Sequence, residues 1–154
     1  MCFCKRLSQY KKILAMKRIC VIDGQGGGIG STIIKKLKEC FGEKVEIIAL
    51  GANAIATSQM LKARANRGAS GENAIAHTIQ SVDVIIGPIG IILANAMMGE
   101  ITPKIAEAVA SSPAKKLLIP LTQEHVEIVG LSSIPLPHFI ESLIQKNLKD
   151  FTDN

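Results

Sequence analysis

The residues with the clearest chemical potential form a glycine-rich run from Asp23 to Gly30, which reads Asp-Gly-Gln-Gly-Gly-Gly-Ile-Gly. It follows a mainly apolar run, 18–22, and opens an amphipathic stretch that is typical of a helix. Glycine lets the backbone approach a bulky ligand, because it has no Cβ and tolerates positive φ. The free N–H groups and positive dipole end of a following helix suit a phosphate. The run therefore predicts a site for a nucleotide or another phosphate-bearing ligand.

The spacing of these glycines does not fit the dinucleotide fingerprint G-x-G-x-x-G. Gly24 and Gly26 would require a third glycine where Ile29 stands. The wider spacing G-x-x-x-G-x-G does fit, as Gly24, Gly28 and Gly30, and it resembles the first turn of short-chain dehydrogenases. A tight structural turn that binds nothing is the alternative interpretation.

The chemistry of short-chain dehydrogenases does not transfer to this chain. Those enzymes carry a Tyr-x-x-x-Lys pair, whereas the only tyrosine here is Tyr10 and Leu14 occupies the lysine position. The acidic residue that usually meets the adenosine ribose, about 20 residues beyond the glycine loop, is also missing. Asn53 lies in that region and could bind a hydroxyl or cap the next helix. NAD(P) or another nucleotide therefore stays a possible cofactor without being specified.

Three charged residues, of opposite sign, could act on a phosphate in opposite ways. Asp23 borders the expected phosphate and would repel it unless a metal ion or a hydroxyl intervenes, or unless the carboxylate binds N–H groups of the loop. Arg64 and Arg67 flank a loop of small residues and could clamp a phosphate, since a guanidinium matches its geometry. Solvated arginines on the surface are the equal alternative.

Length and charge limit the classes of protein to which this chain can belong. The 154 residues are 47% hydrophobic, which predicts one domain with one core. Residues 1–15 contain four basic and no acidic residues, and without them the net charge falls from +5 to +1. The near-neutral remainder argues against a nucleic-acid partner. We expect 1–15 to be an N-terminal extension, disordered or from a mis-assigned start, and 16–154 to form the domain.

The cysteines and apolar runs indicate a cytoplasmic protein without a membrane segment. Cys20 and Cys40 show no metal-binding spacing and read as small hydrophobic residues. No signal peptide is expected, which favours the cytoplasm. The uncharged run 84–98 is too short to span a membrane, and Gly87, Pro88 and Gly90 interrupt it.

Alternating apolar and amphipathic segments predict an α/β fold. Strands are expected over 18–23, 45–50, 83–86, 116–121 and 126–131. Helices are expected over 29–41, 53–64, from 70 or 71 to about 82, over 91–98, after Thr102-Pro103, and at the C-terminus around 139–148. The residues 65–71 between the second helix and the third are expected to form a loop.

The connections between these strands predict how they are ordered. Only four residues, 122–125, separate the last two strands, and a parallel crossover needs a dozen or more, so the last strand should be antiparallel. We predict a Rossmann-like, doubly wound, mainly parallel sheet of about five strands in the order 2-1-3-4-5. Its switch point lies between strands one and three, where ligands bind in such folds. The loops 24–30 and 87–90 would meet there.

Several motifs also resemble a known family. The run 22–30 is similar to the signature of a bacterial family of short proteins known as domain of unknown function 3842. Residues 49–57, 71–74 and 86–90 carry the same resemblance, which extends from about Lys17 to Leu148 and leaves out 1–15. The resemblance implies membership of that family and brings no activity with it.

These observations give a set of candidate binding residues and two classes of function. The first class is a small nucleotide-binding protein, whether a sensor or a minimal NAD(P)-dependent oxidoreductase. The second is a structural or assembly subunit whose glycine turn binds nothing. An apolar helix over 91–98 also predicts a homodimer, because its whole surface cannot be buried in one subunit. No catalytic or metal-ligating residue is assigned. The candidate ligand-binding residues are Asp23, Gly24, Gln25, Gly26, Gly27, Gly28, Ile29, Gly30, Gly51, Asn53, Arg67, Gly87, Pro88, Ile89 and Gly90.

Overall fold

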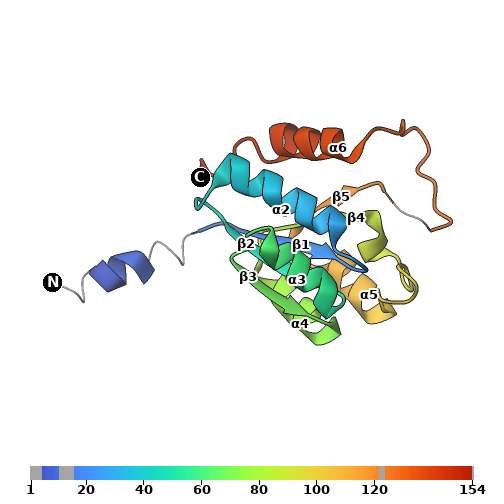
Figure 1. Ribbon diagram of the computed structural model, residues 1–154, viewed down its shortest axis with the longest axis horizontal. Helices are drawn as coiled ribbons and strands as arrows, with labels where there is room; N and C mark the ends of the chain where they lie inside the picture. The colour runs from blue at the N-terminus through green and yellow to red at the C-terminus, as the bar shows by residue number, and fades with distance from the viewer. Residues whose placement is uncertain (1–4, 11–15, 122–123, 154) are drawn as a thin grey trace.

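The computed structural model describes residues 5–10, 16–121 and 124–153. Its centre is one five-stranded sheet with the order β3-β2-β1-β4-β5, in which every neighbouring pair is parallel (Figure 1). The strands are β1 (Arg18–Asp23), β2 (Glu46–Gly51), β3 (Arg67–Ser70), β4 (Val84–Pro88) and β5 (Lys115–Ile119). The α/β class is therefore as the sequence predicts, whereas the sheet is parallel throughout and not only mainly so.

Helices cover both faces of the sheet, because its central strands are apolar on both sides. Ile19 and Val21 of β1 pack against α2, α3 and α6, whereas Cys20 and Ile22 pack against α4, α5 and the 3-10 helices η1 and η2. Figure 1 shows α2 and α6 on one side of the sheet and α4 and α5 on the other. The helical segments are α2 (Gly28–Phe41), α3 (Ala54–Lys62), α4 (Glu72–Thr78), η1 (Ile79–Ser81), η2 (Ile89–Ile92), α5 (Pro103–Ser111), α6 (Leu136–Ser142) and the π-helical turn η3 (Leu143–Asn147).

Local sequence explains where the helices that frame the site begin. Helix α2 buries Ile33, Ile34 and Leu37 on one face, at the spacing of an amphipathic helix. The side chain of Asn53 caps α3 by accepting a hydrogen bond from the Ala56 N–H at 2.8 Å. The Thr102 hydroxyl caps α5 in the same way, and Pro103 follows at the first helical position.

The predicted strand order is wrong at both ends of the sheet. Residues 67–70, which the sequence predicts as loop, form the edge strand β3 beside β2. Their small side chains carry no strand pattern, but a Cβ on Gly68 would contact the Leu61 side chain at 3.0 Å, so close packing of α3 favours glycine there. Tertiary context decides the conformation of such short edge segments.

The expected antiparallel fifth strand is not formed. The described residues 124–135 contain no strand, and Val129 is 96% exposed, so the alternating pattern of 126–131 has no neighbouring strand in this chain to pair with. The last strand is instead β5, which is parallel to β4. The crossover between them contains α5 and is long enough for a parallel connection.

The helix expected over 91–98 is also wrong. Helix η2 ends at Ile92, and the chain then turns repeatedly until α5 begins. Positive φ angles at Asn95, Met97 and Met98 are incompatible with an α-helix. Ile91 and Ala96 are nevertheless buried in this subunit, so the all-round apolar surface from which a homodimer was predicted is absent.

Residues 5–10, which precede the expected domain, form a helical turn in which every residue is exposed. The start of the domain at residue 16 therefore stays a prediction. None of the described helices has both the length and the apolar character needed to cross a membrane.

Candidate functional site

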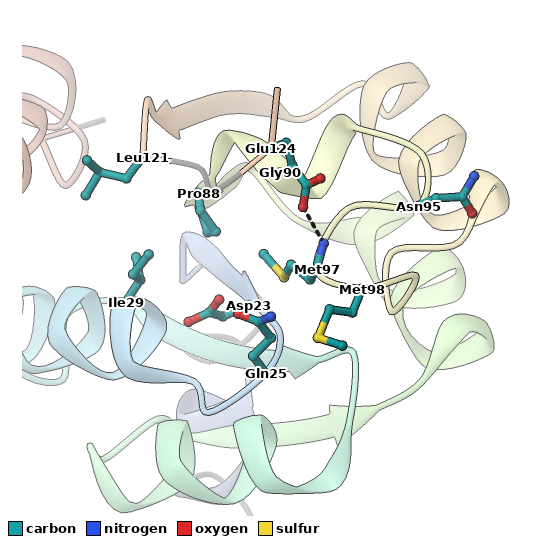
Figure 2. Close-up of a pocket in the computed structure, with 10 residues that line it drawn as sticks. All are labelled: Asp23, Gln25, Ile29, Pro88, Gly90, Asn95, Met97, Met98, Leu121 and Glu124. Carbon is teal, nitrogen blue, oxygen red and sulfur yellow. Dashed lines mark hydrogen bonds between the residues drawn. The ribbon is translucent and has the colours of Figure 1, made fainter. Parts of the chain in front are cut away.

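A cavity of about 520 Å³ lies at the carboxyl ends of β1 and β4, the switch point of the sheet (Figure 2). It is lined by residues at and just after the ends of both strands, by residues of the turns before α5, and by residues of the segment after β5. Its volume falls in the range typical of small-molecule sites. The lining residues are Asp23, Gln25, Ile29, Pro88, Gly90, Asn95, Met97, Met98, Leu121 and Glu124.

Asp23 ends β1 and holds the glycine loop together. Its side chain is 4% exposed, and its two carboxylate oxygens accept hydrogen bonds from the N–H groups of Gly24 at 2.8 Å and Gly30 at 2.7 Å. Burial raises the pKa of Asp23 above its ordinary value, although these N–H groups oppose the shift, and nearby Glu100 raises the pKa further. Asp23 therefore satisfies donors of the loop that a ligand could otherwise have used.

Replacing Asp23 by asparagine should destabilise the fold by about 1–3 kcal/mol, because the new NH₂ group would face a buried loop N–H. The raised pKa means that the folded chain binds this proton more tightly than the unfolded chain. The wild-type advantage over Asp23→Asn should thus be largest below the ordinary carboxyl pKa of about 4 and shrink as pH rises through the folded pKa. Urea unfolding of both proteins across pH measures this, and an advantage that grows with pH would contradict it.

The remaining N–H groups of the glycine loop divide into paired and open donors. The Gln25 N–H donates to Glu100 Oε2 at 2.8 Å, and the Gly27 N–H closes a turn onto the Gly24 carbonyl at 2.9 Å. Within the described residues, no hydrogen bond satisfies the N–H groups of Gly26 and Gly28. Neither glycine is itself among the residues that line the cavity, but both lie on the chain between Gln25 and Ile29, which do line it.

Packing explains three of the loop glycines and leaves two unexplained. A Cβ on Gly24 would lie 2.7 Å from Met97 Sδ, and one on Gly30 would lie 2.5 Å from Met60 Sδ. Gly27 has a φ of +71° and would place a Cβ 2.8 Å from the Ala56 backbone. A Cβ on Gly26 or Gly28 would meet no atom within 4 Å. Among the glycines of this loop, these two combine an unpaired N–H with open space at the Cβ position.

Three further predicted site residues have structural contacts that account for them. Gly51 has no room for a Cβ because Thr57 of α3 packs against it, and a Cβ on Gly87 would lie 2.5 Å from the Ile22 carbonyl oxygen. Asn53 caps α3 and donates to the Gln25 carbonyl at 3.0 Å and to Glu100 Oε2 at 2.9 Å. Asn53 therefore joins the glycine loop to the cap of α3.

Two predicted residues lie away from the cavity. Arg67 begins β3, and its Nε forms an ion pair with Glu46 Oε1 at 2.7 Å, at the amino ends of the strands. Ile89 begins η2 and lines a different cavity along β5. Pro88 and Gly90, on either side of Ile89, do line the cavity at the switch point.

The turns before α5 contribute cavity residues that the sequence did not indicate. Asn95, Met97, Met98 and Gly99 have φ angles of 65°, 56°, 57° and 89°. Such angles are strained for the two methionines, and strain of this kind concentrates at binding sites. Met98 is 96% exposed, and it lines the cavity as Gln25 does (Figure 2). Asparagine and glycine tolerate positive φ, so Asn95 and Gly99 were the signal in the sequence that could have indicated a turn here.

The segment after β5 also reaches the cavity. Leu121 and Glu124 line it, and Glu124 Oε1 accepts a hydrogen bond from the Met97 N–H at 2.8 Å, the dashed line in Figure 2. No sequence motif marks either residue. Three carboxylates, those of Asp23, Glu100 and Glu124, thus accept from backbone N–H groups around this cavity. The described residues contain no group of three side chains suited to holding a metal ion.

Two solved structures share general similarity with this fold. A universal stress protein in complex with cAMP aligns with a TM-score of 0.40 and 16% identity, over 68% of this chain and 98% of that chain. A dodecameric FMN-dependent UbiX-like decarboxylase from Escherichia coli O157:H7 aligns with a TM-score of 0.44 and 19% identity, over 84% of this chain and 75% of that chain. Similarity at this level carries no argument about a ligand.

Comparison by sequence identifies the family. No curated protein matches the chain. Residues 18–152, which contain all five strands and every residue that lines the cavity, match the family described as Domain of unknown function (DUF3842). The chain belongs to that family.

Proposed function

We propose that this protein binds a small phosphate-bearing ligand, such as a nucleotide, in the cavity at the switch point. The phosphate would accept hydrogen bonds from the N–H groups of Gly26 and Gly28, and the rest of the ligand would lie among Ile29, Pro88 and Met97. One observation carries the proposal. Gly26 and Gly28 combine unpaired N–H groups with open space, and packing gives no reason for glycine at either position.

The electrostatics of the first turn of α2 support the same position. Helix α2 has 14 residues, and its positive dipole end lies at Gly28. Its first turn contains no acidic side chain, although the Asp23 carboxylate approaches from β1. A phosphate at Gly26 and Gly28 would use donors that Asp23 leaves unoccupied.

A thermal-shift screen of the full chain tests this function. The panel contains AMP, NAD, NADP, FMN, S-adenosylmethionine and inorganic phosphate, each at millimolar concentration. At 100 times its dissociation constant, a ligand should stabilise the folded state by about 2.7 kcal/mol, which raises the melting temperature by several degrees. A screen in which no phosphate compound raises the melting temperature would reject phosphate binding.

The contacts of the loop weaken the alternative of a dinucleotide-dependent oxidoreductase. No acidic residue ends β2, and Asn53, the residue that could have met a ribose, has its side-chain groups bonded within the protein. A catalytic residue is not assigned, so an enzymatic activity forms no part of the proposal.

An assembly function has a separate observation in its favour. The segment 126–131 pairs with no strand among the described residues, and it exposes four apolar side chains to between 37% and 96%: Val126, Ile128, Val129 and Leu131. Such a patch is typical of a contact surface. We propose that it forms the homodimer contact in place of the absent helix over 91–98.

Replacing Val129 by glutamate should therefore shift the solution mass from twice the 16.5 kDa of one chain to that of one chain. A charge at the centre of an apolar contact has to be desolvated without a partner, which disfavours association. Light scattering across a dilution series measures both proteins, with Glu127→Gln as a control on the same segment. A wild-type mass of one chain at every concentration would reject the homodimer.

A further inference from the structure

We infer that the Glu100 side chain closes the glycine loop against its ligand, because its carboxylate occupies an N–H group that a phosphate would otherwise bind. This inference rests on the proposed function and adds a regulatory contact to the same site. Glu100 lies in the turns before α5, far from the loop in the sequence. A phosphate has to displace this carboxylate before it can use every donor of the loop.

The carboxylate of Glu100 is hydrogen-bonded to the loop and to the cap of α3. Its Oε2 accepts hydrogen bonds from the Gln25 N–H at 2.8 Å and from Asn53 Nδ2 at 2.9 Å. A Cβ on Gly24 would lie 2.8 Å from the same oxygen, so the carboxylate sits directly against the loop. Hydrogen bonds to an ionised oxygen are stronger than those between neutral groups. Glu100 therefore presents to the loop the kind of oxygen that a phosphate would present.

The backbone around Gln25 contains the left-handed residues that anion-binding turns use. Gln25 and Gly27 have φ angles of 48° and 71°. Residues in this region let successive N–H groups converge on one anion, an arrangement called a nest. The Gln25 N–H is bound by Glu100, whereas those of Gly26 and Gly28 are unpaired within the described residues. The chain thus supplies its own anion to one donor of the run.

Glu100 can leave this position without any change in the sheet. Its side chain is partly exposed, so rotation about its own bonds can carry the carboxylate into solvent. The turn that carries it includes Met97 and Met98, whose positive φ angles are strained for methionine. Met98 is 96% exposed and adds little packing that would hold the turn in place. The contact with Gln25 is therefore a closure that a competing anion can open.

The charge of Asp23 keeps this closure from being permanent. Burial raises the pKa of Asp23, and the nearby negative charge of Glu100 raises it further. Two carboxylates this close repel each other, which offsets part of what the hydrogen bonds of Glu100 contribute. When a phosphate replaces Glu100, one anion at the loop is exchanged for another. The exchange adds less repulsion from Asp23 than binding beside an occupied Gln25 N–H would.

Titration of the full chain with inorganic phosphate tests the closure by comparing wild type with Glu100→Gln. Glutamine keeps an oxygen that can accept from the Gln25 N–H, but it lacks the charge that competes with phosphate. The apparent affinity of a site falls with the fraction of molecules in which the site is closed. We expect Glu100→Gln to bind phosphate about tenfold more tightly than wild type, because one nearby negative charge is removed. Glu107→Gln, at an exposed position of α5, should bind as wild type does.

A spectroscopic measurement reports the displacement itself. In wild type, the ¹³C signal of the Glu100 carboxyl group should move toward that of an exposed glutamate as phosphate is added. The signal of the exposed Glu107 should stay where it is. A residue that only supports the loop would keep its contact with Gln25 when phosphate binds, so its signal would not shift in this way.

The outcomes separate the closure from the proposed function. Equal or weaker phosphate binding by Glu100→Gln, or phosphate binding without a shift of the Glu100 signal, would overturn the closure and leave phosphate binding intact. A failure of both wild type and Glu100→Gln to bind phosphate or any phosphate compound of the thermal-shift panel would reject the proposed function and the closure together.

Discussion

Replacing Gly28 by valine should abolish binding of the phosphate-bearing ligand, with a loss of at least 100-fold in affinity, and leave the fold intact. The new side chain would occupy the open space at the Cβ position of Gly28, next to the N–H to which the phosphate is proposed to bind. It meets no protein atom within 4 Å at its Cβ, and the φ of Gly28 is outside the left-handed region. The melting temperature should change by only a few degrees, because glycine-to-valine also reduces the entropy of the unfolded chain.

Titration of the best ligand from the thermal-shift screen measures this loss in the purified variant. Lys35→Val provides the matched control, since it introduces the same side chain at an exposed position of the same helix. The control should bind as wild type does. Wild-type affinity in Gly28→Val would show that the ligand does not use this amide, and would contradict the proposed phosphate position.

Replacing the adjacent Gly27 by alanine should have the opposite effect and destabilise the fold by about 2–4 kcal/mol. Its φ of +71° is strained for alanine, and the added Cβ would approach the Ala56 backbone to 2.8 Å. Because backbone of α3 cannot move aside as a flexible side chain would, α3 must shift away from the loop. The melting temperature should fall by roughly 4–16 °C for a domain of this size.

Thermal and urea unfolding measure this loss, and Gly26→Ala is the control, because a Cβ there meets nothing within 4 Å. The two substitutions are at neighbouring positions, and Gly27→Ala should be less stable than Gly26→Ala by most of the loss expected for Gly27→Ala. A Gly27→Ala protein as stable as Gly26→Ala would show that the loop and α3 do not pack as tightly as described.

The sequence predicted those parts of the fold whose patterns were repeated over several residues. The central strands β1, β2 and β4 are continuous apolar runs, and α2 has a clear apolar face. The predicted position of the switch point follows from these elements alone. Short segments with mixed signals were predicted wrongly. Residues 67–70 become a strand because they lie along β2. Residues 126–131 have a strand pattern, but they pair with no strand in the described part of the chain.

The candidate site was predictable only where it is continuous in the sequence. The glycine run pointed to Gly26 and Gly28, but it could not separate them from Gly24, Gly27 and Gly30. That distinction depends on Met97, Ala56 and Met60, which come from three other parts of the chain. Glu100 and Glu124 were missed for the same reason, since they reach Gln25 and Met97 from turns that no periodic pattern in the sequence indicates.

The strand order also has a consequence for the route by which this chain acquires its binding site during synthesis. Strands β1, β2 and β3 pair in the order in which the ribosome makes them, so this half of the sheet can form early. Strand β4 must then return to the other edge of β1, and the segment with Glu124 follows still later. The cavity therefore lies between the half of the sheet that is synthesised first and the segments that are synthesised later. A ligand that binds there can stabilise only the completed chain, and the nascent N-terminal half must persist without it.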